Sequence, residues 1–237
     1  MKTDTIEYRD GGTTCRGILV YDETKSGRRP GIVIAPDIRG VGLRPKGKPE
    51  RLAQMGYAVL VADMYGDGTN MRDFEHGMQL IMGVRKDTAQ WRNRIRAAVD
   101  ALAAQPQCDK DKIAAIGYCF GGSTVIELAL SGAPVKAVVS FHGGLDGLKL
   151  DDAKNVKSKV LVCTGAEDPM IQAPKVVALQ EAFRAAKVPD WEVCTYSDTK
   201  HSFTDPETPN TPNTAYNKAA DERSWASMVR LFNEVFG

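Results

Sequence analysis

The stretch around Cys119 has the residue types and spacing of a reactive thiol. Cys119 stands between Gly117 and Gly121, directly after the apolar run 113–116, a pattern that predicts a strand, a tight turn and a helix from Phe120. Glycine at the two flanking positions leaves room for the crowded backbone of such a turn. The N-terminal amides of the helix would lie beside the sulfur and favour its thiolate form. The pattern therefore predicts a nucleophile rather than a buried structural cysteine.

Two later loops carry residues that would activate such a thiol. Asp168 follows the predicted strand 159–164, and His201 follows the predicted strand 191–196. In this arrangement the histidine takes the proton of the nucleophile and returns it to the leaving group, while the carboxylate orients the imidazole and stabilises its charged form. Glu167 competes for the role of the acid. We favour Asp168, because the proline after it stiffens the turn.

The three histidines of the chain differ in their settings. His76 lies in a polar stretch, which is typical of a surface residue. His142 follows the predicted strand 135–141 and is expected to face the pocket, but it precedes the acid in the chain. His201 therefore remains the predicted base.

Alternating strands and helices must position these residues. An N-terminal hairpin is predicted over 3–9 and 13–21, and further strands are predicted at 31–36, 57–62, 113–116, 135–141, 159–164 and 191–196. Helices are predicted at 49–55, 87–105, from Phe120 to about Gly132, at 173–187 and from about Thr214, whereas residues 63–90 show no clear pattern before the second helix. The alternation predicts one α/β domain over residues 1–237, with a mostly parallel sheet and helices on both faces. The site should lie beyond the C-terminal ends of the strands.

The loop after the strand at 31–36 is a further candidate part of the site. In folds with this kind of nucleophile turn, one oxyanion-binding amide follows the nucleophile and the other comes from the loop after an early strand. We therefore expect the backbone amides of Phe120 and Ile38 to bind the oxyanion. Asp37 either faces the site or caps its own loop, and both interpretations stay open.

Composition excludes several classes of partner. The net charge is +1 and the basic residues are spread along the chain, so we expect neither nucleic acid nor an anionic membrane as a partner. The N-terminus has no apolar segment typical of a signal peptide and no run is long enough to span a membrane, which predicts a cytoplasmic protein. We expect either a monomer or a homodimer. Its five cysteines form no C-x-x-C and no metal-ligand spacing, so we expect reduced thiols, no metal and no cofactor.

Four motifs resemble those of the dienelactone hydrolase family of α/β-hydrolases: Gly117–Gly122, Ser140–Gly144, Gly165–Asp168 and His201–Phe203. The likeness extends over nearly the whole chain. It implies the α/β-hydrolase fold and a triad of Cys119, Asp168 and His201. The implied reaction is hydrolysis of a small-molecule ester or lactone through a thioester acyl-enzyme.

The resemblance also bears on the substrate. In the dienelactone-cleaving members, a glutamate at the position of Asp37 contacts the resting thiol, and an arginine four residues after the catalytic histidine binds the substrate carboxylate. Here Asp37 has a shorter side chain, and Asp205 stands at the arginine position with the opposite charge. Arg39, Arg85 and Arg92 are candidates for a compensating cation. The predicted thiol-contacting or substrate-binding residues are therefore Asp37, Arg39, His142 and Phe203.

Two other functions share these features. A thioesterase or an acyl-peptide hydrolase would use the same triad on a different acyl substrate. In a non-catalytic, redox-sensing relative, Cys119 would be oxidised rather than acylated. Only the substrate range and covalent labelling separate these alternatives from an ester or lactone hydrolase.

Overall fold

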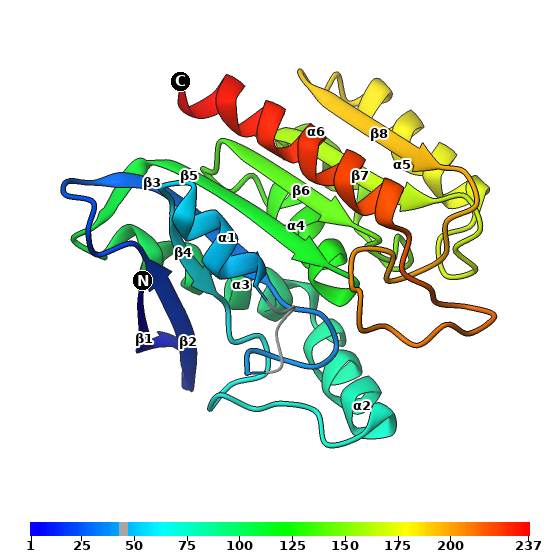
Figure 1. Cartoon of the computed structure of the whole chain (residues 1–237). Helices are drawn as coiled ribbons and strands as arrows, with labels where there is room; N and C mark the ends of the chain where they lie inside the picture. Colours follow the sequence, from blue (N-terminus) through cyan, green and yellow to red (C-terminus); the bar gives the residue numbers. More distant parts are fainter. Residues whose placement is uncertain (43–46) are drawn as a thin grey trace. The chain divides into compact units, whose positions relative to one another are not determined.

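A computed structural model describes residues 1–42 and 47–237 of the chain. The chain forms two compact units, Met1–Ile116 and Gly117–Gly237, which are described in turn. Strand β5 (Cys108–Tyr118) runs through the boundary between them and ends at the residue before Cys119 (Figure 1).

The first unit is built on strands in the order β1, β2, β4, β3 and β5. β1 (Lys2–Asp10) pairs antiparallel with β2 (Thr13–Tyr21), which confirms the predicted hairpin, and β2 continues antiparallel to β4 (Ala58–Val61). β3 (Arg29–Ala35) is parallel to β4, and both strands are buried almost throughout. Helices α1 (Lys48–Gln54) and α3 (Thr88–Ala103) cover the two faces of these strands (Figure 1).

Helix α2 (Phe74–Arg85) lies in the part of the sequence that showed no clear pattern. Its start is fixed by Asp73, whose side chain accepts the backbone N–H of His76. The sequence of α2 shows no clear helical periodicity, because Gly77 and Gly83 interrupt its apolar pattern. The helix presents only Gly77 and Ile81 as buried residues.

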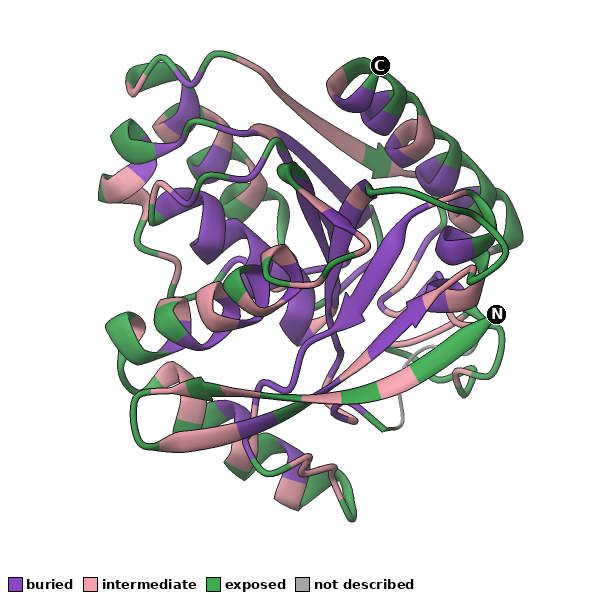
Figure 2. Cartoon of the chain, turned by 90° about the vertical axis from the view of Figure 1, so that its left-hand side faces the viewer, coloured by how far each residue is buried: buried purple, intermediate pink, exposed green. Residues whose placement is uncertain are grey.

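The second unit contains three parallel strands, β6 (Ala137–Phe141), β7 (Lys159–Gly165) and β8 (Trp191–Tyr196). Helix α4 (Phe120–Leu130) is buried at every position and packs against β6. α5 (Ala173–Ala185) and α6 (Lys218–Phe236) lie on opposite faces of these strands, and a short 3-10 helix, η1 (Leu150–Asn155), joins β6 to β7 (Figure 1). Figure 2 shows that the strands at the centre are buried, whereas the outer faces of the surrounding helices are exposed.

Helix α6 begins later than the sequence predicts. It starts at Lys218 rather than near Thr214, because Asn217 caps it by accepting the backbone N–H of Ala220. The residues before the cap serve another purpose: the backbone N–H of His201 donates to Asn213 at 3.2 Å, and Ala215 donates to the carbonyl of His201 at 3.2 Å. The loop after β8 thus fixes the main chain of the predicted base.

The predicted α/β class, with a mostly parallel sheet and an N-terminal antiparallel pair, is confirmed by these pairings. In the described part of the chain, none of the helices combines the length and the apolar character needed to cross a membrane.

Candidate active site

Cys119 occupies a strained turn between β5 and α4. Its φ of 53° and ψ of −115° are unusual for a residue with a side chain, and such strain concentrates at functional sites. The backbone N–H of Cys119 donates to the carbonyl of Phe141 at 3.0 Å. A Cβ on Gly117 would come within 2.0 Å of the carbonyl oxygen of Gly121, so only glycine fits there. The sharp turn predicted from the sequence is therefore present.

The first turn of α4 packs closely on the loop after β6. A Cβ on Gly122 would lie 2.6 Å from the Cα of Gly143, and a Cβ on Gly143 would lie 2.5 Å from the carbonyl carbon of Gly122. The hydroxyl of Ser123 donates to the carbonyl of Gly144 at 2.6 Å. This approach brings His142, which precedes these glycines, against the main chain of Cys119.

The side chains of Asp168 and His201 form a buried pair. Nδ1 of His201 bonds to Oδ2 of Asp168 at 2.7 Å, while Oδ1 of Asp168 accepts the backbone N–H of Met170 at 2.9 Å. Both residues are 3% exposed. Glu167, the competing candidate for the acid, is exposed to solvent.

The two loops that carry this pair are joined by their main chains. A Cβ on Gly165 would meet the carbonyl oxygen of Thr199 at 2.1 Å, so the ends of β7 and the loop after β8 touch directly. The backbone N–H of Glu167 donates to Thr199 at 3.0 Å, and that of Ala166 donates to Tyr196 at 2.8 Å. The separation between Asp168 and His201 is therefore set by backbone contacts rather than by the side chains alone.

Electrostatics favour a charged His201. Burial lowers the pKa of this imidazole, but the negative charge of Cys119 and the hydrogen bond to Asp168 outweigh burial and raise the pKa to about 10. Nε2 of His201 is buried and has no hydrogen-bond partner of normal geometry within residues 1–42 and 47–237. Both the charge of Cys119 and its contact with the imidazole therefore raise the pKa of His201.

His142 lies beside this pair and has a partner for each ring nitrogen. Its Nδ1 accepts the backbone N–H of Cys119 at 3.1 Å, and its Nε2 bonds to the hydroxyl of Thr204 at 2.9 Å. An acceptor Nδ1 carries no proton, so the ring is neutral and Nε2 is the donor. The ring is 3% exposed and meets that of His201 edge-on, with centroids 5.0 Å apart.

The two predicted phenylalanines are both buried. Phe203 is fully buried, and its ring meets His142 at 5.2 Å and Tyr196 at 5.7 Å between centroids. Phe120 is 4% exposed and begins α4. The ring of Phe203 therefore supports His142 by packing.

The remaining predicted residues belong to the first unit. Asp37 is buried, and its carboxylate accepts the backbone N–H of Arg39 at 2.9 Å and the guanidinium Nε at 3.0 Å. Asp37 and Arg39 therefore neutralise each other within one loop. The carbonyl of Ile38, between them, accepts the hydroxyl of Tyr65 at 3.0 Å.

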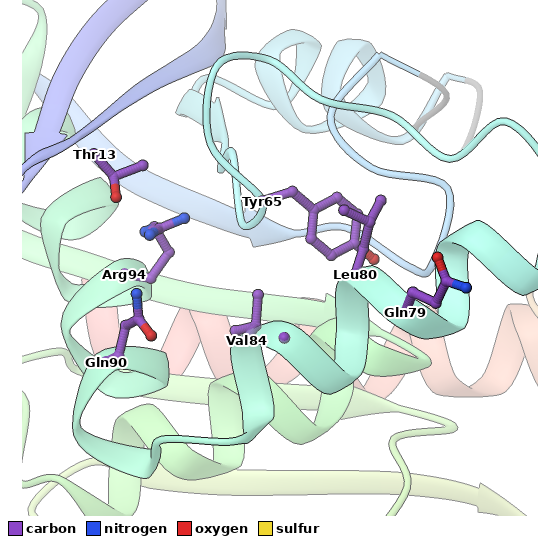
Figure 3. A pocket seen from close by; sticks show the side chains of 8 residues that line it. Thr13, Tyr65, Gln79, Leu80, Val84, Gln90 and Arg94 are labelled. Carbon is purple, nitrogen blue, oxygen red and sulfur yellow. The ribbon is translucent and has the colours of Figure 1, made fainter.

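Tyr65 lies in the stretch without a clear sequence pattern, and its hydrogen bond to Ile38 was not predicted. Its ring also lines a cavity of about 300 Å³ with Leu80, Val84, Gln90 and Arg94 (Figure 3). The Arg94 guanidinium in this cavity is held by Asp10 at 2.8 Å. Residues 1–42 and 47–237 contain no group of three or more His, Cys, Asp or Glu side chains arranged to hold a metal ion.

Comparison with known proteins extends over both units. Residues 16–236 match the model of the dienelactone hydrolase family. The carboxymethylenebutenolidase of Pseudomonas putida is 29% identical over 207 residues, which covers 84% of each chain. The crystal structure of a dienelactone hydrolase-like promiscuous phosphotriesterase from metagenomic libraries is 45% identical, with a TM-score of 0.94 over 100% of this chain and 99% of that one.

A more distant structure shares the fold alone. Dienelactone hydrolase from Anabaena variabilis is 19% identical, with a TM-score of 0.69 over 100% of this chain and 99% of that one. The family match reaches from the second strand of the hairpin to the last helix and includes every residue of the candidate site. The chain accordingly belongs to the dienelactone hydrolase family, as an α/β-hydrolase that acts on esters or lactones.

Proposed function

We propose that the protein hydrolyses small carboxylic esters or lactones through a thioester on Cys119. The observation that carries this proposal is the state of His201. Its Nδ1 is bound by the buried carboxylate of Asp168, and its buried Nε2 has no partner of normal geometry among the described residues. A histidine in this setting is suited to shuttle a proton between a thiol and a leaving group.

Acylation begins from the thiolate of Cys119 and the imidazolium of His201. The sulfur attacks the carbonyl carbon, and the carbonyl oxygen gains negative charge. The backbone amides of Phe120 and Ile38 are the proposed donors to this oxyanion, a contribution worth about 3–4 kcal/mol per donor in comparable sites. His201 then gives its proton to the leaving alkoxide, and the C–O bond breaks to leave the thioester.

Deacylation uses the same groups in reverse. His201, now neutral, takes a proton from water, and the hydroxide attacks the thioester carbonyl. Collapse of the second tetrahedral intermediate breaks the C–S bond, releases the carboxylic acid and restores the thiolate and imidazolium. Asp168 stabilises the imidazolium in both halves of the cycle without itself taking a proton.

A neutral substrate fits this site better than one with a carboxylate. Asp205 stands four residues after His201, where dienelactone-cleaving relatives carry an arginine, and its Oδ1 accepts the backbone N–H of Glu207 at 3.0 Å. The candidate cation Arg39 already bonds Asp37. We therefore propose that uncharged esters and lactones are preferred over anionic ones.

The charge preference has a direct test. We expect a higher kcat/KM for p-nitrophenyl butyrate than for the p-nitrophenyl monoester of succinate, which is of similar length but carries a carboxylate. The variant Asp205→Arg should narrow or invert this ratio, while Asp205→Asn should narrow it less. Equal kcat/KM for the two esters in the unmodified protein would contradict the charge argument.

The nucleophile is tested by covalent trapping. Hydrolysis of p-nitrophenyl acetate should show a burst, and mass spectrometry should find one acetyl group on Cys119. Cys119→Ala should abolish both, and Cys119→Ser should keep a small residual rate, because an alkoxide needs more help from the base than a thiolate does. Activity that survives in a folded Cys119→Ala variant would refute the proposal.

A phosphotriester is a second candidate substrate. The observation in its favour is the 45% identity to the promiscuous phosphotriesterase over the whole chain. Cys119 would then attack phosphorus in place of carbon, the bond from phosphorus to the aryloxide would break, and water would cleave the S–P bond to release the phosphodiester. Turnover of the aryl phosphotriester paraoxon that disappears in Cys119→Ala would support this side activity, and its absence would limit the protein to carboxylic substrates.

We further propose that residues 1–237 act as one domain and that the protein works in a reducing compartment such as the cytoplasm. The family match from residue 16 to 236 spans both compact units and supports the first part. All five cysteines are free thiols, which supports the second. A single cooperative unfolding transition would be the expected behaviour of one domain.

A further inference from the structure

Two cysteines outside the candidate active site lie side by side on neighbouring strands. Cys163 of β7 and Cys194 of β8 are direct partners in the parallel register. Paired residues of a parallel ladder point to the same face, and neighbouring strands lie about 4.8 Å apart. This spacing falls within the range of about 4.4–6.8 Å between the Cα atoms of a disulfide.

The two thiols differ in their surroundings. Cys163 is fully buried, whereas Cys194 is half-buried. The hydroxyl of Tyr196 donates to Sγ of Cys163 at 3.7 Å. The hydrogen bond from the Cys163 thiol lowers the pKa of Cys194 despite its burial, and the same contact raises that of Cys163. The more accessible sulfur is thus the more acidic one.

Charged groups from two elements face Cys194. Glu192, on the same strand, opposes formation of a thiolate, and Arg230 of α6 favours it. These two residues bind each other, with Nη2 of Arg230 at 2.7 Å from Oε1 of Glu192. Their effects on the pKa of Cys194 oppose each other, and the hydrogen bond from the Cys163 thiol is the largest cause of its lowered pKa.

The position of β8 allows the two sulfurs to come together. β8 is the last strand in the sheet order of the described residues, so β7 is its pairing partner on one side only.

We propose that Cys163 and Cys194 form a redox-active dithiol that hydrogen peroxide converts to a reversible disulfide. The Cys194 thiolate attacks one peroxide oxygen, the O–O bond breaks, and hydroxide leaves, so that Cys194 becomes a sulfenic acid. Sγ of Cys163 then attacks the sulfur of Cys194, the S–S bond forms and the S–O bond breaks. The second hydroxide takes the proton of Cys163, and the sum is two thiols and one peroxide giving one disulfide and two waters.

The test uses the full chain with Cys119→Ala, so that the outcome does not depend on the proposed esterase activity. After peroxide treatment, the intact mass should fall by two hydrogen atoms and recover with dithiothreitol. Peptide mapping should find Cys163 linked to Cys194. In the same background, Cys163→Ala should gain one oxygen at Cys194 instead of forming the linkage, and dimedone would label this sulfenic acid. The oxidation should be slower, because the hydrogen bond that lowers the pKa of Cys194 is lost.

A matched variant controls for nonspecific oxidation. Cys108 is buried and burial raises the pKa of its thiol to about 12, so Cys108→Ala should leave the linkage unchanged. An unchanged mass under peroxide, a linkage that involves another cysteine, or oxidation of Cys108 before Cys194 would each overturn the proposal.

Discussion

Nδ1 of His142 accepts the backbone N–H of Cys119 at 3.1 Å, so a neutral imidazole holds the main chain of Cys119 rather than its sulfur. The same N–H also donates to Phe141, which makes it a shared bond. Thr204 fixes the other ring nitrogen, and Phe203 packs against the ring. His142 is therefore placed to orient the strained turn on which the thiol stands.

We expect His142→Ala to lower kcat on the order of 10²-fold with a smaller change in KM, because small displacements of a reacting group cost about that much. His142→Asn should recover more activity than His142→Gln. The side-chain oxygen of asparagine can take the place of Nδ1 and accept from Cys119, whereas glutamine reaches toward Thr204 instead. Steady-state kinetics with p-nitrophenyl acetate would check this order, and equal loss in all three variants would indicate a purely structural role.

The pH dependence should differ between leaving groups. Since the pKa of His201 is raised to about 10, its proton is available to a leaving group throughout the neutral range and is lost as the pH rises through 10. The kcat/KM of an ethyl ester, whose alkoxide needs that proton, should fall above pH 10. The p-nitrophenyl ester should fall less, because its phenolate leaves unprotonated. A shared limb near neutrality for both esters would contradict the assignment.

The same raised pKa affects stability. His201 is more basic in the folded chain than its ordinary value of 6.5, so its protonation stabilises the fold fully below pH 6.5 and this contribution is lost as the pH rises through 10. Removal of the Cys119 charge should lower the pKa of His201. An NMR titration of the His201 ring in the unmodified protein and in Cys119→Ala would measure this directly.

Asp168 and Glu167 offer a matched pair of substitutions. Asp168→Asn should lower kcat by up to about 10⁴-fold, the loss found when the acid of a Ser–His–Asp triad becomes an amide. Glu167→Gln should leave kcat unchanged, because that side chain is exposed and Asp168 provides the bond to His201. Steady-state kinetics of the two variants would show whether Asp168, rather than Glu167, is the acid that supports His201. A comparable loss of kcat in both variants would contradict this assignment.

Because Gly165 contacts Thr199, we expect alanine at Gly165 to destabilise the fold far more than alanine at Gly83. Gly165→Ala would force a Cβ to within 2.1 Å of a backbone oxygen, and we expect a loss of about 3 kcal/mol or more in the free energy of unfolding. Gly83→Ala, in the exposed helix α2 with open space at its Cβ, should stabilise by up to about 1 kcal/mol. Urea denaturation of both variants measures the difference.

The elements that the sequence predicted well are those with continuous apolar runs. The strand predicted at 159–164 matches β7 to within one residue, because its apolar residues are buried. β5 begins at Cys108, five residues before the apolar run. The residues between them, 109–112, are all charged and mostly exposed. Charge hides such an extension from a pattern that looks for apolar residues.

For the site, residue type and chain order predicted Cys119, Asp168 and His201, and the structure pairs Asp168 with His201. The use of each polar atom could not be predicted in this way. That position 142 is a histidine does not predict that its Nδ1 accepts a backbone N–H instead of binding a thiol or a substrate. Likewise the proximity of Asp37 and Arg39 in sequence does not say that they would form a bidentate pair. These choices depend on side-chain rotamers and on the approach of distant loops.

The direct contact between the ends of β7 and the loop after β8 has a practical consequence for altering selectivity. With Gly165 against Thr199, and Ala166 and Glu167 bonded across to that loop, randomising these positions would mostly yield unfolded chains. A mutant library aimed at new substrates should therefore leave the segments 165–168 and 199–201 intact.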